Sequence, residues 1–116
     1  MDWRGRVVAR PRRGASLFAQ HDVAAEHFRR VAAAFRDPIL QYYAAMFLGV
    51  EQEELGDTAG ARASYDRANR LFPKAPSPLL ALSALARGQG DSAEALASVR
   101  RLLELPKQAG RMGDDP

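Results

Sequence analysis

The chain has 116 residues, of which 47% are hydrophobic and 27% are charged, a composition that suits one compact domain. It contains no cysteine, which excludes disulfide frameworks, thiolate nucleophiles and cysteine-based zinc sites. Seventeen Lys and Arg against 14 Asp and Glu give a formal net charge of +3, and this excess is concentrated at the amino terminus.

Residues 1–12 are expected to form an extended basic arm. Five arginines lie in the first 13 residues: Arg4, Arg6, Arg10, Arg12 and Arg13. Arginines can contact phosphates while Trp3 stacks on a base, so the arm supports an alternative function as a nucleic-acid-binding accessory protein. Two other interpretations stay open: a short solubilising extension, or a segment whose Trp3, Val7 and Val8 fold back over the exposed end of the first hairpin.

A degenerate helical hairpin is predicted after the arm. It pairs a short helix near residues 13–20, which contains Leu17 and Phe18, with a helix over residues 23–35. Pro11 limits any upstream extension of the short helix. The second helix matches a later one at an offset of 37, with Ala24, Phe28 and Val31 against Ala61, Tyr65 and Ala68.

The first complete hairpin is predicted over residues 38–73. Its first helix has apolar residues at three- and four-residue steps: Ile39, Leu40, Tyr43, Ala44, Phe47, Leu48 and Leu55. Asp37 is expected to cap this helix and Pro38 to take its first position, where a missing N–H costs nothing. Gly56 suits the left-handed conformation that ends a helix, and Asp57 is placed to cap the next helix.

A second hairpin repeats the first at an offset of 34 residues. The superposed pairs include Leu48 on Leu82, Gly56 on Gly90, Asp57 on Asp91 and Ala61 on Ala95. Ser77 and Pro78 mark the start of its first helix, and the copies close on Pro73 and Pro106. Duplicated helix pairs of this kind predict an all-α repeat domain over residues 13–106.

This pattern resembles the tetratricopeptide repeat, a helix–turn–helix unit of 34 residues. The matching positions of the first copy are Leu48, Gly49, Gly56, Asp57, Ala61, Tyr65, Ala68 and Pro73. The first copy departs at Ala45, where the family usually has Trp, and at Gln52, where it usually has Tyr; the second departs at Ser83, Val99 and Leu102. The resemblance implies a right-handed α-solenoid of two clear hairpins plus the degenerate one, acting as a non-enzymatic protein-interaction or assembly module.

The resemblance also implies a concave groove that receives a partner's peptide or helix. The residues that match its lining are Tyr43, Met46, Val50, Glu53, Glu54, Leu80, Ala84 and Arg87. Family members that grip a peptide carboxylate have Lys and Asn where this chain has Met46 and Val50, which argues against that specificity. In an alternative interpretation, Tyr43 and Met46 simply pack inside a small helical bundle.

Catalytic and metal-binding residues are not predicted, and no cofactor is expected. An acidic cluster formed by Glu51, Glu53, Glu54 and Asp57 is interpreted as a solvated helix face. His21 and His27 lie six residues apart, a spacing that does not place two ligands on one helix face. A small enzyme would regain support only from turnover that depends on His21 or His27.

A protein or peptide is therefore the expected partner. No apolar run is long enough to span a bilayer and no apolar stretch follows the basic amino terminus, so a cytoplasmic protein without membrane contact is expected. Leu96 and Leu103 on the outer face of the last hairpin favour cover by another copy, as in a homodimer. Residues 107–116 are polar and Gly-rich and are expected to form a flexible tail.

Overall fold

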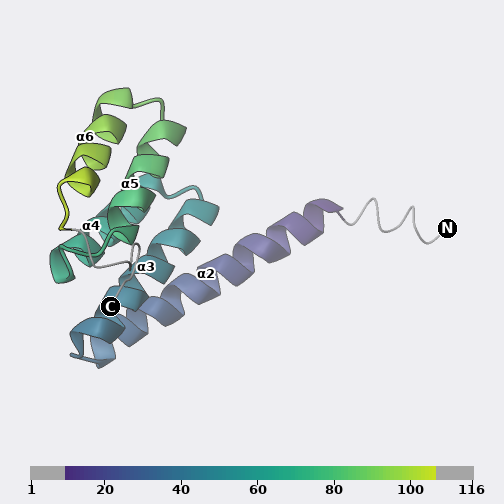
Figure 1. Ribbon diagram of the computed structural model, residues 1–116. Helices are drawn as coiled ribbons and strands as arrows, with labels where there is room; N and C mark the ends of the chain where they lie inside the picture. Colours follow the sequence, from purple (N-terminus) through teal and green to yellow (C-terminus); the bar gives the residue numbers. More distant parts are fainter. Residues whose placement is uncertain (1–9, 107–116) are drawn as a thin grey trace.

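Consecutive helices pack side by side and run antiparallel, as the ribbon in Figure 1 shows. The computed structural model describes the backbone of residues 10–106 and the side chains of residues 19–106. Within these limits every regular element is helical: α2 (Arg10–Ala34), α3 (Pro38–Glu54), α4 (Thr58–Leu71), α5 (Ser77–Gly88) and α6 (Ser92–Leu103). The prediction of an all-α domain is confirmed. None of the described helices is both long enough and apolar enough to cross a membrane.

The predicted degenerate hairpin is wrong, because α2 is one continuous helix of 25 residues. No turn separates residues 13–20 from residues 23–35. Neither glycine nor proline occurs between Gly14 and Asp37, so nothing in that stretch interrupts the helix. Pro11 lies in the first turn, where proline is tolerated.

The predicted arm is also shorter than residues 1–12, since the helix already includes Arg10 and Arg12. The rest of the predicted arm, residues 1–9, and the predicted tail, residues 107–116, lie outside the described residues. Ala24, Phe28 and Val31 of α2 are only half-buried, whereas Ala25 is fully buried. The offset of 37 therefore misses the residue that α2 buries most deeply.

The cap at the start of α3 and the turn between α3 and α4 form as predicted. The Asp37 side chain caps α3 by accepting a 2.9 Å hydrogen bond from the Ile39 amide. Gly56 has a φ of +79°, and the Asp57 carboxylate accepts a 2.9 Å bond from the Gly60 amide. These contacts satisfy amides that the first turn of a helix leaves without partners.

The turn between α5 and α6 repeats this geometry. Gly90 has a φ of +75°, and the Asp91 carboxylate accepts a 3.0 Å bond from the Glu94 amide. The backbone bonds that close the two turns also correspond, since the Asp57 amide donates to Gln52 at 2.8 Å and the Asp91 amide donates to Ala86 at 2.9 Å. The 34-residue periodicity is therefore present in the backbone of both turns.

The core runs through the middle of the helix series. One cluster joins α4 to α5 through Ala61, Tyr65, Leu79, Leu82 and Leu85. A second joins α3 to α4 and the following loop through Tyr42, Ala45, Ala68 and Ala75. Met46 of α3 packs against both clusters, which makes α3, α4 and α5 one packed unit.

Two positions that depart from the tetratricopeptide pattern, Ala45 and Gln52, lie in this core. Ala45 is buried beside Tyr42 and Ala68, so less side-chain volume fills the space between α3 and α4 than a Trp would occupy. Gln52 is buried, and its side-chain amide makes a 2.5 Å hydrogen bond with the Ser64 hydroxyl of α4. A polar contact thus links α3 and α4 at the position where the tetratricopeptide pattern usually has Tyr.

Candidate protein-interaction face

Several predicted groove residues on α3 and α5 are exposed or half-buried. We call the surface formed by Tyr43, Met46, Val50, Leu80 and Ala84 the α3–α5 face. Val50 is 46% exposed and Leu80 is 52% exposed, and Ala84 is exposed one turn further along α5. Large apolar side chains this exposed are candidates for contact with another molecule.

Tyr43 and Met46 are half-buried and belong to both the core and this face. Met46 packs against the two core clusters, and Tyr43 packs against the cluster around Tyr42. The ring of Tyr43 lies edge-on to Tyr42, with centroids 5.1 Å apart. Tyr43 and Met46 therefore pack against the core, as the bundle interpretation predicts, and each keeps part of its side chain exposed.

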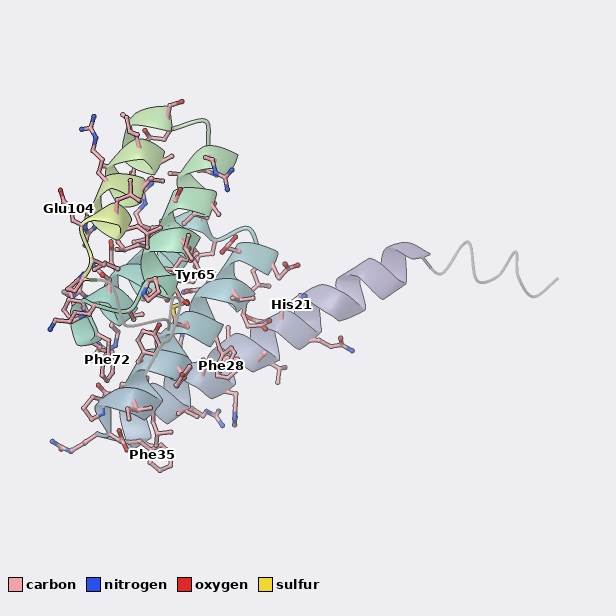
Figure 2. The ribbon with its side chains drawn as sticks, viewed as in Figure 1. His21, Phe28, Phe35, Tyr65, Phe72 and Glu104 are labelled. Atoms are coloured by element: carbon pink, nitrogen blue, oxygen red, sulfur yellow. The ribbon has the colours of Figure 1, made fainter. Side chains whose placement is uncertain are left out.

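An aromatic contact that the sequence interpretation missed extends this face toward α2. Phe47 is 51% exposed, and its ring stacks on Phe28 of α2 with centroids 5.4 Å apart. Phe47 also stacks on Tyr43 at 6.3 Å. Figure 2 shows Phe28 directed from α2 toward the neighbouring helix. The sequence could have indicated Phe47 as part of this face. Phe47 lies four residues after Tyr43 and three before Val50, and residues at these spacings share one helix face.

Two charged residues predicted for the groove differ in their contacts: Glu53 is hydrogen-bonded to a side chain of α4, whereas Arg87 is exposed. The hydroxyl of Tyr65, a fully buried side chain of α4, donates a hydrogen bond to Glu53 Oε2. Burial first, and then this hydrogen bond and the charge of Glu53, raise the pKa of Tyr65 well above its ordinary range. Arg87 is exposed on α5 and makes no ion pair within the described part of the chain.

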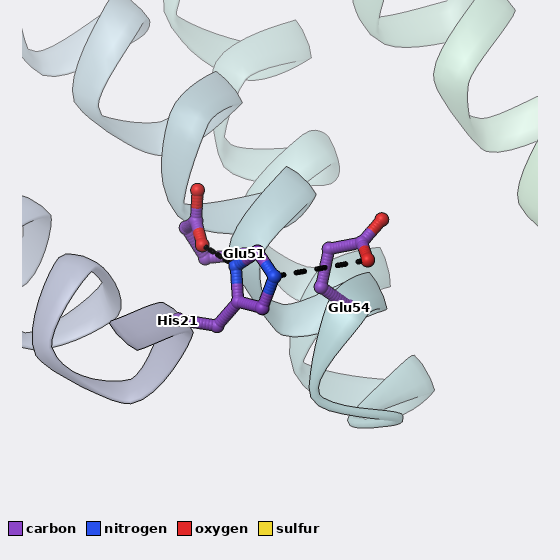
Figure 3. A network of polar contacts seen from close by, with 3 residues as sticks. All are labelled: His21, Glu51 and Glu54. Atoms are coloured by element: carbon purple, nitrogen blue, oxygen red, sulfur yellow. Dashed lines mark hydrogen bonds and ion pairs between the residues drawn. The ribbon is translucent and has the colours of Figure 1, made fainter. Parts of the chain in front are cut away.

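His21 joins α2 to the carboxyl-terminal end of α3. Its Nδ1 lies 2.5 Å from Glu51 Oε1, and its Nε2 lies 3.9 Å from Glu54 Oε1 (Figure 3). Only 19% of the Glu51 side chain is exposed, so the expectation of a solvated acidic face is wrong for this residue. The contact holds α2 against α3 at the end far from their connecting loop.

The described residues provide no metal site and no side-chain geometry for the basic arm. No group of three or more His, Asp or Glu side chains among the described residues could hold a metal ion. For the basic arm, Trp3, Arg4 and Arg6 lie outside the described residues. Arg10, Arg12 and Arg13 lie in the first turn of α2, within the stretch of residues 10–18 for which only the backbone is described.

Comparisons with protein-family models, with curated proteins and with solved structures find no match to this chain. The tetratricopeptide resemblance therefore rests on the residues of the chain and on its repeated turns.

Proposed function

We propose that this protein is a non-enzymatic interaction module of tetratricopeptide-like architecture, which binds a helix or extended segment of a protein partner along the α3–α5 face. The observation that carries the proposal is the exposure of Val50 and Leu80, at 46% and 52%, together with the partial exposure of Tyr43 and Met46. Covering such side chains removes apolar area from water, the main favourable term in most protein association.

The repeated turns support the tetratricopeptide-like part of the proposal. Gly56 and Asp57 close the first hairpin as Gly90 and Asp91 close the second, with corresponding hydrogen bonds. An ion pair also joins equivalent helices of the two hairpins, since Arg62 of α4 lies 2.7 Å from Glu94 of α6. Stacked units of this kind present a rigid surface, which limits the entropy lost on binding.

Site-specific photocrosslinking in the native source tests the proposal. A photoreactive residue at Leu80 is expected to capture a discrete partner, whereas the same residue at Ala63, exposed on α4, is expected to capture none. Leu80 capture is expected to fall at least tenfold when Val50→Asp is introduced, because a charge on this face must be desolvated on binding. The matched control Ala63→Asp is expected to leave it unchanged.

Two results would argue against this function. Equal capture from Leu80 and Ala63 would show that the α3–α5 face is not selective. Binding to RNA or DNA that falls steeply with salt and disappears when residues 1–13 are removed would instead favour the nucleic-acid alternative.

A further inference from the structure

We infer that the connection between α2 and α3 is a separate docking surface, which attaches the protein to a bilayer surface that contains anionic lipids. We call the exposed residues Phe35, Arg36, Ile39 and Leu40 the α2–α3 tip. None of them belongs to the α3–α5 face, so the inference goes beyond the proposed function and does not depend on it.

The tip gathers exposed apolar side chains at one end of the molecule. Phe35, Ile39 and Leu40 are 49%, 46% and 42% exposed. All eight residues of the range 33–40 are exposed, and Figure 2 shows Phe35 at the lower end of the ribbon, where α2 meets α3. A projecting group of three side chains offers little area to a protein partner, whose interface usually buries about 800 Å² on each side. A fluid lipid surface needs no complementary pocket and therefore suits this tip better.

The backbone of the tip is already hydrogen-bonded within the protein. The Phe35 carbonyl accepts a 2.9 Å bond from Gln41 Nε2, and the Phe35 amide donates to the Val31 carbonyl at 3.1 Å. The Ile39 amide donates to the Asp37 carboxylate at 2.9 Å. Moving a polar group out of water is costly unless it keeps a hydrogen-bond partner, so these contacts lower the cost of placing the tip among lipid headgroups.

Basic side chains surround the tip. Arg36 lies within it, and Arg67 of α4 reaches the first turn of α3, with Nη2 3.3 Å from Gln41 Oε1. Arg70 and Lys74 are exposed in the last turn of α4 and in the loop that follows. None of these four cations forms an ion pair within the part of the chain that the structure describes. Their charge is therefore available to lipid phosphates.

The acidic side chains of α3 gather at its opposite end, as Glu51, Glu53 and Glu54. Near the tip, Asp37 caps α3, where the positive end of the helix dipole offsets its charge. Further back on α2, Glu26 is paired with Arg29 and Arg30. Opposite charges at the two ends of α3 turn the tip, and not the acidic end, toward an anionic surface.

An anionic bilayer surface matches both features of the tip. Phe35, Ile39 and Leu40 enter the boundary between headgroups and acyl chains, while Arg36 keeps its guanidinium at the level of the phosphates. Side chains at this depth need no spanning helix. The expectation of a protein without membrane contact considers only spanning segments and amino-terminal signals, so it does not address this kind of contact.

Vesicle flotation with the full-length protein tests the inference. We expect binding to vesicles of equal parts phosphatidylcholine and phosphatidylglycerol, at least tenfold weaker binding to phosphatidylcholine alone, and weaker binding as salt rises. Ile39→Ser with Leu40→Ser is expected to weaken binding at least tenfold, because less apolar area leaves water. Arg36→Gln with Lys74→Gln should do the same, since each cation near an anionic surface contributes roughly fivefold.

Matched variants remove similar side chains elsewhere. Leu96→Ser with Leu103→Ser removes two exposed leucines of α6, and Arg87→Gln with Arg100→Gln removes two exposed cations. Both controls are expected to bind the mixed vesicles as the unsubstituted protein does. Circular dichroism checks that every variant keeps its helices.

A fluorophore reports the depth of the tip. Because the chain has no cysteine, Leu40→Cys provides a single attachment point for an environment-sensitive dye. Its emission is expected to shift to the blue on mixed vesicles. The same dye on Ala63→Cys, at an exposed position of α4, is expected to show no shift.

Three outcomes would overturn the inference: no binding to the mixed vesicles, binding that survives Ile39→Ser with Leu40→Ser, or equal dye shifts at residues 40 and 63. Binding that is lost in Arg4→Gln with Arg6→Gln but kept by the tip variants would assign the contact to the amino-terminal arginines instead. Capture of a protein by a photoreactive residue at Leu40, without vesicle binding, would show that the tip docks a protein. Capture at Leu80 is measured separately, so the proposed function can stand or fall alone.

Discussion

The ring of Tyr65 on α4 lies against the backbone of Gly49 on α3, so closely that a Cβ at residue 49 would stand 2.5 Å from Tyr65 Cε1. Gly49→Ala is therefore expected to destabilise the protein by about 1–3 kcal/mol, because the buried ring must move within a packed core. Alanine's better helix propensity, worth up to about 1 kcal/mol, offsets part of this loss. Urea unfolding followed by circular dichroism measures the change.

Gly88 on α5 provides the matched control. A Cβ built at Gly88 meets nothing within 4 Å. Gly88→Ala is expected to be neutral or to stabilise by up to about 1 kcal/mol. Equal effects of the two substitutions would contradict the close approach of α3 and α4 at Tyr65.

The cap at the start of α4 gives a second prediction. Asp57→Ala is expected to lower the free energy of unfolding by about 0.5–2 kcal/mol, because the Gly60 amide loses its 2.9 Å acceptor. Asp57→Asn keeps an acceptor oxygen and is expected to retain most of the stability. If both variants lose the same amount in thermal denaturation, the effect comes from the charge and not from the cap.

Tyr65 predicts a loss of stability in alkali. Its pKa is raised in the folded protein, whereas tyrosines of an unfolded chain titrate near pH 10, so the folded state binds this proton more tightly. The resulting stabilisation is complete below about pH 10 and declines as pH rises above that value, by at most about 1.4 kcal/mol per pH unit. Tyr65→Phe is expected to flatten this part of the stability profile. Parallel profiles for the two proteins would refute the assignment.

The contact between His21 and Glu51 is expected to stabilise the docking of α2. A double-mutant cycle of His21→Ala and Glu51→Ala should give a coupling energy of about 0.5–1.5 kcal/mol. The same cycle with Glu54→Ala should give less, because its oxygen lies 3.9 Å from His21 and its side chain is 58% exposed. Hydrogen exchange in α2 should accelerate in His21→Ala; unchanged protection would show that α2 is held by other contacts.

Neighbouring leucines of α6 should respond differently to truncation. Leu102 packs against the cluster around Leu82, whereas Leu103 is 77% exposed. Leu102→Ala is expected to cost about 1–2 kcal/mol, below the range for a fully buried leucine, and Leu103→Ala less than about 0.5 kcal/mol. A larger, concentration-dependent cost for Leu103→Ala would indicate that another copy covers this face.

Features encoded over a few residues were predictable from the sequence. The turns at Gly56 and Gly90 and the caps at Asp57 and Asp91 form as predicted, since their hydrogen bonds join residues three to five positions apart. The hairpin predicted before residue 35 is wrong, because it was based on similarity to a later helix and not on local turn residues. No glycine or proline lies between Gly14 and Asp37, and α2 is continuous there.

By itself, the sequence determined the helical class, the periodic turns and the apolar stripes, because these depend on backbone preferences and spacing along one helix. Only the tertiary structure decided which side chains of a helix are buried. Phe47 and Tyr42 lie on the same helix, yet Phe47 is half-exposed beside Phe28 while Tyr42 is fully buried beside Phe72. Burial depends on which neighbouring helices cover each face, and that arrangement is set by contacts between residues far apart in the chain.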